Sequence, residues 1–162
     1  MSRFEKIIIS ITGASHLLVH AMMLSLPSLI LIIQKDYPAG LDIYGFAVSL
    51  SAFLFGLGAI PAGWLDRRFG GRNLLITYQI GSALSSIIMT ISSSFLGLII
   101  GLSLLGLFCS IYHPTGLTII SQNLKSVSKG MGLHAMFGSL GSAIGPLLAV
   151  SISSIFSWRA AY

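Results

Sequence analysis

Charged side chains, and acidic ones above all, are scarce in this sequence. Only 8% of its 162 residues are charged and only 4 are Asp or Glu, whereas 54% are hydrophobic. A typical soluble domain has about 25% charged residues. This scarcity therefore excludes a soluble domain and predicts a protein that crosses a membrane several times.

Cysteine and clustered basic charge are lacking too. Cys109 is the single cysteine, which excludes an intrachain disulfide and a cysteine-based metal site. The net charge of +5 comes from basic residues dispersed at the ends of apolar segments, without the stacking aromatics of a nucleic-acid surface. The first apolar segment is too long for a signal-peptide core and lacks a small-x-small cleavage site, so we interpret it as an uncleaved first span.

Long apolar segments make up most of the chain. The stretch 74–121 contains no charged residue and is long enough for two crossings, with Ser92, Ser93 and Ser94 as the predicted reversal. Backbone polar groups must be satisfied internally in lipid, so every span is predicted to be helical. The expected fold is an all-α membrane protein with five transmembrane helices at about residues 7–33, 43–64, 74–91, 95–121 and 130–156.

The basic residues predict the orientation of these spans. With the N-terminus inside, Lys35 and Arg159 lie outside, and seven lie inside: Arg3, Lys6, Arg67, Arg68, Arg72, Lys125 and Lys129. Cytoplasmic loops carry an excess of Lys and Arg. We therefore expect a multi-pass protein of the cell (inner) membrane with a cytoplasmic N-terminus.

The most polar stretch between two spans is 61–73, interpreted as a tight turn at the cytoplasmic surface. It resembles the loop after the second helix of major facilitator superfamily transporters, Gly-x-Leu-Ala-Asp-Arg-x-Gly-Arg-Arg. Aligned on the glycines, Asp66 stands one place before the acid of that pattern, and one place on a helix is ~100° of rotation. Aligned on the acid instead, Asp66 and Arg67 match the pattern and the loop gains one residue. The resemblance implies a gating loop formed by Gly63, Asp66, Arg67, Arg68, Gly70 and Arg72.

The fifth span carries a stripe of small residues. Gly141 and Gly145, with Gly138 one turn earlier, would let another helix approach closely, and Pro146 would bend the span. The Gly-x-x-x-Gly-Pro sequence resembles a signature best known from proton-coupled exporters of the same superfamily. Ordinary helix packing is an equally acceptable interpretation of these glycines.

Histidines are the groups within the spans that titrate near neutral pH. His16 and His20 are four residues apart on one face of the first span, and His113 lies in the fourth. From the helix rise, His16 and His113 lie ~14 Å and ~12 Å from the inner side, so we expect them to face a common cavity. His134 is placed one turn into the fifth span. Since no Asp or Glu inside a span supplies a third ligand, no metal site is expected.

The stretch from Tyr112 to Gly116 resembles the fourth helix of exporters related to fosmidomycin resistance, and His16-x-x-x-His20 stands where that subgroup often has His-x-x-x-Asp. The resemblance implies a secondary transporter, not an enzyme, without a cofactor. His16, His20, Tyr112 and His113 would line the path of a small-molecule solute and of protons.

Transporters of this superfamily have two six-helix halves. The chain is therefore expected to be the N-terminal part, an incomplete six-helix bundle truncated before the sixth helix. Its expected partners are the lipid bilayer, the solute, protons and the missing C-terminal half. A non-transporting membrane fragment, a scaffold or a half-transporter subunit is the alternative.

Overall fold

Helices form the whole framework of the protein. A computed structural model describes residues 1–162. Its elements are α1 (Arg3–Ile33), α2 (Leu41–Phe69), α3 (Gly71–Ile91), α4 (Phe95–Ser110), α5 (Tyr112–Asn123), α6 (Val127–Ile155) and the short 3-10 helix η1 (Trp158–Ala161). Together α4 and α5 make one apolar crossing, so the chain has five helices long and apolar enough to span a membrane.

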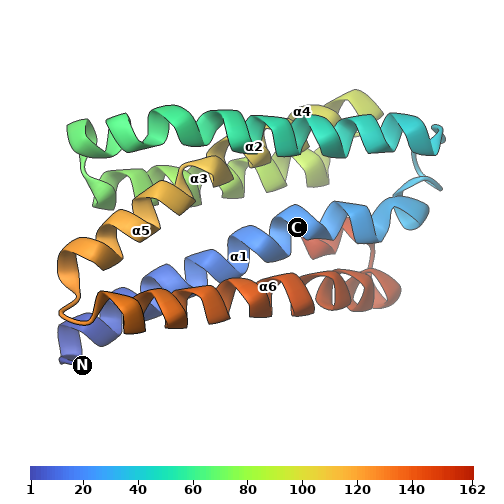
Figure 1. Ribbon diagram of the computed structural model, residues 1–162. Coiled ribbons are helices and arrows are strands. Elements are labelled where there is room, and N and C mark those ends of the chain that lie inside the picture. The colour runs from blue at the N-terminus through green and yellow to red at the C-terminus, as the bar shows by residue number, and fades with distance from the viewer.

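The helices form two layers (Figure 1). In one, α1 packs along α6, which is its most extensive contact; in the other, α4 packs against α2 and α3. From the second layer α5 slants across to α1, and so joins the two. One end of the bundle holds the N-terminus and the α2–α3 and α5–α6 connections, while the other holds the α1–α2 and α3–α4 connections and η1. We call these the inner and the outer end, after the predicted orientation.

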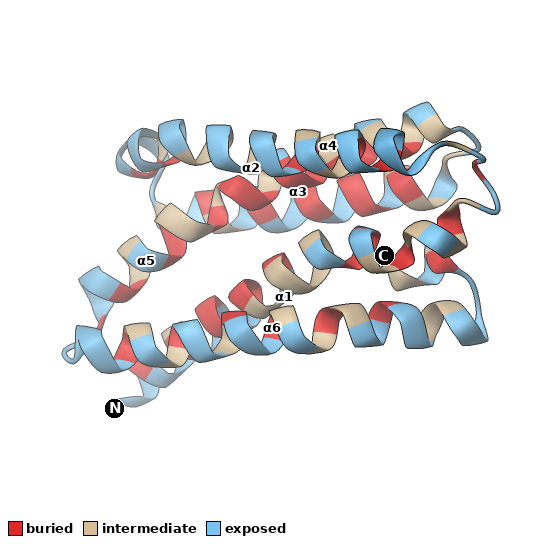
Figure 2. Cartoon of the chain, turned by 45° about the vertical axis from the view of Figure 1, so that its right-hand side comes forward, coloured by how far each residue is buried: buried red, intermediate tan, exposed pale blue.

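The outward faces of the helices are largely exposed, and the buried residues lie mostly on the faces between the two layers (Figure 2). Large exposed side chains such as Ile60, Ile91 and Phe156 lie on this surface, each at least three-quarters exposed. Such a surface is costly in water and suits hydrocarbon. The architecture is therefore that of an all-α membrane protein.

The stretch 61–73 is mostly helix rather than turn, which corrects the sequence interpretation. α2 continues through Phe69, and the chain reverses at one residue, Gly70, whose φ of +79° is the only positive value in the chain. Gly71 already begins α3. A glycine adopts this backbone conformation without the clash of a Cβ atom, so one residue makes a reversal for which several polar residues were expected.

The predicted uninterrupted span 95–121 is broken at Ile111. Pro114 lacks an amide hydrogen, and its ring is incompatible with a regular helical carbonyl at Ser110, four residues earlier. The Ile111 N–H bonds instead to the Phe108 carbonyl at 3.2 Å, a tighter turn than that of an α-helix. The break lets α5 leave the direction of α4 and brings the residues after Ile111 towards α1 and α6.

Glycines bring α1 and α6 into backbone contact. A Cβ atom at Gly141 would collide with the backbone of Leu17, and one at Gly145 would lie 2.5 Å from the Ala21 Cα. The small-residue face of the fifth span thus lies against the first span. This approach sets the distance at which side chains of α1 and α6 meet in the bundle.

Candidate functional site

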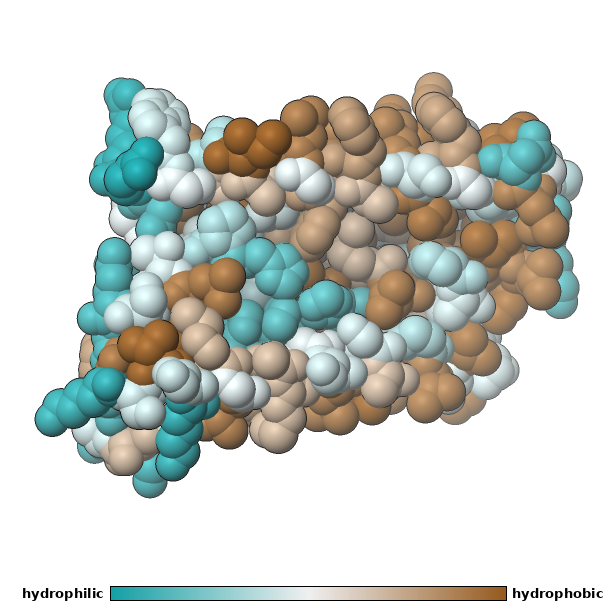
Figure 3. Space-filling model, viewed as in Figure 1, coloured by the Kyte–Doolittle hydropathy of each residue, from teal (hydrophilic) through white to brown (hydrophobic).

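Four imidazoles and a phenol meet midway along the bundle. They come from three helices: His16 and His20 from α1, Tyr112 and His113 from α5, and His134 from α6. His16 is central, with its ring centroid 3.9 Å from that of His134, 4.8 Å from His20 and 4.9 Å from His113. A hydrophilic patch is visible midway along this face of the bundle, between apolar surfaces (Figure 3). We call these five residues the histidine cluster.

A backbone acceptor sets the proton positions on His16. Its Nδ1 lies 2.7 Å from the His134 carbonyl oxygen, which can only accept, so Nδ1 carries the proton and Nε2 of the neutral ring is left with a lone pair. The His20 Nε2 lies 3.1 Å from that atom. The lone pair of His16 therefore points to His20, and the pair needs either a proton or a cation between its two nitrogens.

The same reasoning orients Tyr112. Its hydroxyl donates to the Thr12 carbonyl and lies 3.0 Å from the His134 Nε2, which must then be the donor of that contact. Tyr112 is fully buried and His134 is 3% exposed. These two residues hold the buried side of the cluster, while His20 and His113 are partly exposed.

The expected residues His16, His20, Tyr112 and His113 thus lie together, but their rings pack against one another. The principal pockets of the bundle are lined by other residues. His134 belongs to the cluster although the sequence interpretation gave it no part in the path. The signal was its spacing: His134 stands one turn before Gly138, whose missing side chain leaves room for the His16 ring.

The residues predicted to gate the transporter separate into two groups. Asp66 is 8% exposed and lines a pocket of ≈360 Å³ at the inner end, with Arg72 and Gly71 from α3 and Gln122 from α5. Its Oδ1 atom is buried without a hydrogen-bond partner. The carboxylate thus points into the bundle.

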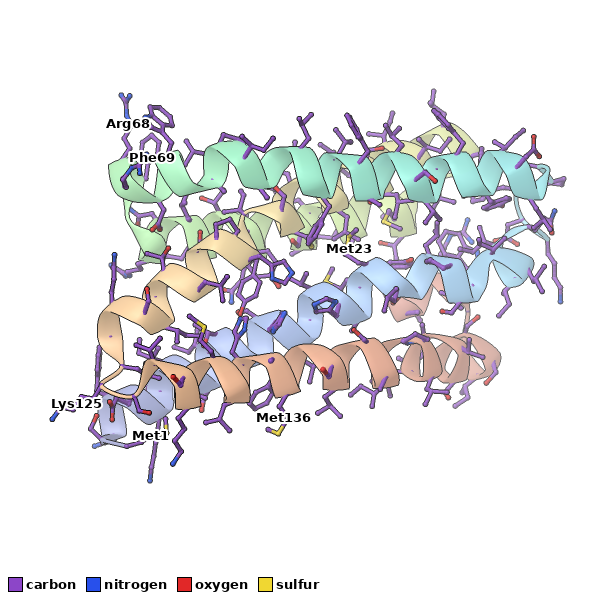
Figure 4. The ribbon with its side chains drawn as sticks, in the orientation of Figure 1. Met1, Met23, Arg68, Phe69, Lys125 and Met136 are labelled. Carbon is purple, nitrogen blue, oxygen red and sulfur yellow. The ribbon has the colours of Figure 1, made fainter.

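Arg67 and Arg68 do not join Asp66. Both are exposed, and the Arg68 guanidinium lies over the rings of Trp64 and Phe69, 5.5 and 5.6 Å from their centroids. Arg68 and Phe69 project away from the bundle at the end of α2 (Figure 4). Gly63 is exposed as well and has no neighbour where a side chain would stand.

The outer end is closed by a second polar group of residues. Asp36 accepts hydrogen bonds from the Trp158 indole at 2.8 Å and from Arg159 at 2.6 Å, and Arg159 also donates to the Tyr37 hydroxyl at 2.8 Å. The Trp158 and Arg159 contacts hold the pKa of the Asp36 carboxyl below its ordinary value. We call Asp36, Tyr37, Trp158 and Arg159 the outer clamp, which ties the end of α1 to η1.

These features define an integral membrane protein with several spans and polar groups in the middle of its bundle. The family model of the Major Facilitator Superfamily matches residues 12–162, so the chain belongs to this superfamily.

Curated relatives carry transporter names. The chain is 26% identical over 117 residues to the inner membrane transport protein YnfM of Escherichia coli (strain K12), which covers 71% of this chain and 28% of that protein. It is 28% identical over 117 residues to the probable anion transporter 6, chloroplastic, of Arabidopsis thaliana, covering 69% of this chain and 23% of that protein. The matches thus span about a quarter of the relatives' length.

Proposed function

We propose that this chain is the N-terminal part of a secondary active transporter, which moves a small solute across the membrane by alternating access and catalyses no reaction. The observation that carries the proposal is the histidine cluster, a group of polar side chains midway between the ends of apolar helices. Polar groups at that depth are costly and mark transport paths. Membership of the superfamily and the transporter names of the relatives support the same function.

In this proposal the solute contacts the partly exposed side of the cluster. His20 and His113 would meet the solute directly, while Tyr112 and His134 hold His16 in place from the buried side. The remaining half of the path would come from the C-terminal half of the transporter, because superfamily members place their sites between two halves. The matched relatives are about four times longer than the match, which supports this arrangement.

A more specific form of the proposal is that the solute is exported and that its export is coupled to proton movement. It rests on the resemblance of Gly141-x-x-x-Gly145-Pro146 to the signature of proton-coupled exporters. A cytoplasmic N-terminus in a cell (inner) membrane rests on the seven basic residues predicted inside against two outside. In that orientation Asp66 and Arg72 would form the inner gate, at the pocket they share.

A non-transporting role is the second candidate, because the chain spans only about a quarter of the relatives' length. The protein in proteoliposomes should decide between them, with a panel of labelled solutes measured for uptake and efflux. Transport requires a solute flux above that of empty liposomes, which His20→Ala and His113→Ala reduce at least ~10-fold, a loss of about 1.4 kcal/mol. Gly132→Ala, at an exposed position of α6 with open space around it, is the matched control.

Collapse of an imposed proton gradient by an ionophore tests the coupling. A flux that continues unchanged would contradict proton coupling but not transport. No flux for any solute with this chain supplemented by a C-terminal half would contradict the transporter itself and favour the scaffold.

A further inference from the structure

Three histidines of the cluster have ring nitrogens close to one another. One nitrogen each from His16, His20 and His113 can be chosen so that all lie within 4.8 Å of one another. His16 and His20 share a face of α1 one turn apart, and the break at Ile111 brings His113 to them from α5. The sequence argument against a metal was the lack of a third ligand, and the fold supplies that ligand from another helix.

The lone pairs are arranged as a metal site requires. In zinc sites a ligating histidine donates its other ring N–H to a carboxylate or a backbone carbonyl, which fixes the tautomer. His16 makes such a bond, from Nδ1 to the His134 carbonyl at 2.7 Å. Its Nε2 then faces the Nε2 of His20, so the buried ligand is already oriented without a metal.

The distances suit a tetrahedral ion. Zn–N bonds of 2.0–2.1 Å at tetrahedral angles place two ligand nitrogens about 3.3 Å apart. The Nε2 atoms of His16 and His20 are 3.1 Å apart, close to this value. His113 is partly exposed, so rotation of its side chain can close the remaining gap.

The chemistry of the ligands restricts the choice of ion to the d-block metals. Imidazole suits zinc, copper, nickel and related d-block ions, whereas Mg²⁺ and Ca²⁺ need oxygen ligands. No carboxylate lies near the cluster, and the single thiol, Cys109, is buried against the Ser82 hydroxyl at 3.5 Å. Three imidazole ligands leave the fourth coordination position of the ion open, so an anion or a water must occupy it. Because the imidazoles are neutral, only an anion would also offset the charge of the ion.

We propose that His16, His20 and His113 bind one divalent transition-metal ion of the zinc class, with the fourth position open towards the partly exposed face. In a second step, the ion and the anion that completes its coordination are themselves transported as cargo. This step rests on the transport function proposed above. An open coordination position and the lack of a compensating carboxylate favour an ion that is released over a permanent structural one.

Binding is tested on the whole chain, purified without a polyhistidine tag, by equilibrium dialysis against Zn²⁺. We expect one Zn²⁺ per chain. We also expect His20→Ala and His113→Ala each to weaken binding beyond the ~10–100-fold loss typical of outer-shell changes. Co²⁺ in the same site should give the visible absorption of a tetrahedral complex, which these variants abolish.

Two variants control for adventitious binding. Cys109→Ser removes the only thiol and Asp66→Asn removes the buried carboxylate of the inner pocket, and neither should change the affinity. Absence of stoichiometric Zn²⁺, or binding that survives both histidine substitutions, would overturn the metal site. Circular dichroism of each variant must show the helical spectrum of the parent. If neither alanine variant folds, His113→Gln, which keeps a polar side chain of similar length, takes their place under the same criteria.

Transport of the ion is measured separately, with a zinc indicator trapped in proteoliposomes. Zn²⁺ flux that depends on His20 and His113 would support the cargo step. Flux of other solutes without any Zn²⁺ flux would overturn the cargo step and leave the transporter standing. Stoichiometric Zn²⁺ binding in a protein that moves no solute even when supplemented by a C-terminal half would support the metal site and overturn the transport function, so the two proposals fail in different ways.

Discussion

Asp36 and Asp66 lie at opposite ends of the bundle and differ in the exposure and in the hydrogen-bond partners of their carboxylates. Asp36 is in the outer clamp, where an indole and a guanidinium donate to its carboxylate. Asp66 is 8% exposed and has a buried oxygen without a partner. The exposed acid is thus satisfied and the buried acid is not, which is the reverse of what stability alone would favour.

The comparison indicates which end of the bundle is held by polar contacts and which end is able to accept a new partner. The outer clamp closes the α1, α3 and η1 ends on one another, since Arg159 also reaches the Ser92 carbonyl at 3.4 Å. At the inner end, Glu5 ties α1 to the backbone N–H of Lys125 at 3.0 Å, but the pocket around Asp66 beside it stays open (Figure 4 shows Lys125 close to the N-terminus). An unsatisfied buried carboxylate is a reservoir of free energy that a partner from elsewhere can release.

The largest effect is expected from Gly145→Leu. A Cβ atom there already lies 2.5 Å from the Ala21 Cα, so a leucine must push α1 and α6 apart. Because Asp36 follows α1 and Trp158 follows α6, the outer clamp should open. We expect a loss of at least about 3 kcal/mol, the upper end of ordinary over-packing, measured as a lower thermal midpoint in detergent.

A Trp64→Phe background leaves the buried Trp158 as the only tryptophan, whose emission reports on the outer end, since the sequence has 2 tryptophans. Its emission should shift to the red in Gly145→Leu. Gly132→Leu on the same helix, at a position with open space, should keep the parent midpoint. Equal destabilisation of the two variants would show that the close approach of Gly145 to α1 is not the cause, since leucine has a higher helix propensity than glycine and should not by itself lower the stability.

The second largest effect should come from Asp66→Asn. Removing the charge of a buried carboxylate that has one oxygen without a partner should stabilise the chain by roughly 2 kcal/mol, within the range for an unsatisfied buried group. If Asp66 gates transport, the same variant should lose solute flux while its thermal midpoint rises. Asp42→Asn, at an exposed position, should change neither. A lower midpoint in Asp66→Asn would mean that the carboxylate has a stabilising partner.

A smaller effect on stability, with a local effect on the site, is expected from Gly138→Ala. The added methyl group would lie 2.6 Å from the Nδ1 of His16, so the ring must turn away and its bond to the His134 carbonyl must break. Ring movement costs less than backbone movement, about 1 kcal/mol. Binding of Zn²⁺ should weaken more than in Gly132→Ala. Unchanged binding would show that the space left by Gly138 does not fix the position of the His16 ring.

Local patterns predicted much of this fold because each depends on a few neighbouring residues. The first and third spans end at Ile33 and Ile91, as expected from Gln34 and the three serines. Pro114 was a visible signal for the break at Ile111, but a proline alone does not decide between a break and a bend: α1, α2 and α6 continue through Pro27, Pro61 and Pro146.

The candidate site was predictable only in part, because it is assembled from three helices. Depth along each helix placed His16 and His113 at one level, and the structure puts their centroids 4.9 Å apart. The place of His134 depends on the close approach of α1 and α6, and the inward direction of Asp66 on the continuation of α2 past Trp64. The first is a tertiary feature that no single segment contains, and the second is the helical continuation of a segment for which a turn was predicted.

The smallest effect concerns Asp36 and the outer clamp. Contacts with Trp158 and Arg159 lower the pKa of this carboxyl in the folded chain, so the clamp contributes stability above the unfolded-state pKa of about 3.9 and loses it as the pH falls through the lower folded value. The Asp36 and Arg159 side chains are 43% and 33% exposed, so screening by solvent keeps the contribution near about 0.5 kcal/mol.

Between pH 7 and 5 the emission of Trp158 should stay constant, and below about pH 4 it should shift to the red as the carboxylate is protonated. Asp36→Asn should abolish this transition, whereas Asp42→Asn should retain it. A transition of equal size in Asp36→Asn would assign the acid sensitivity to another group and leave the clamp without a role in closing the outer end.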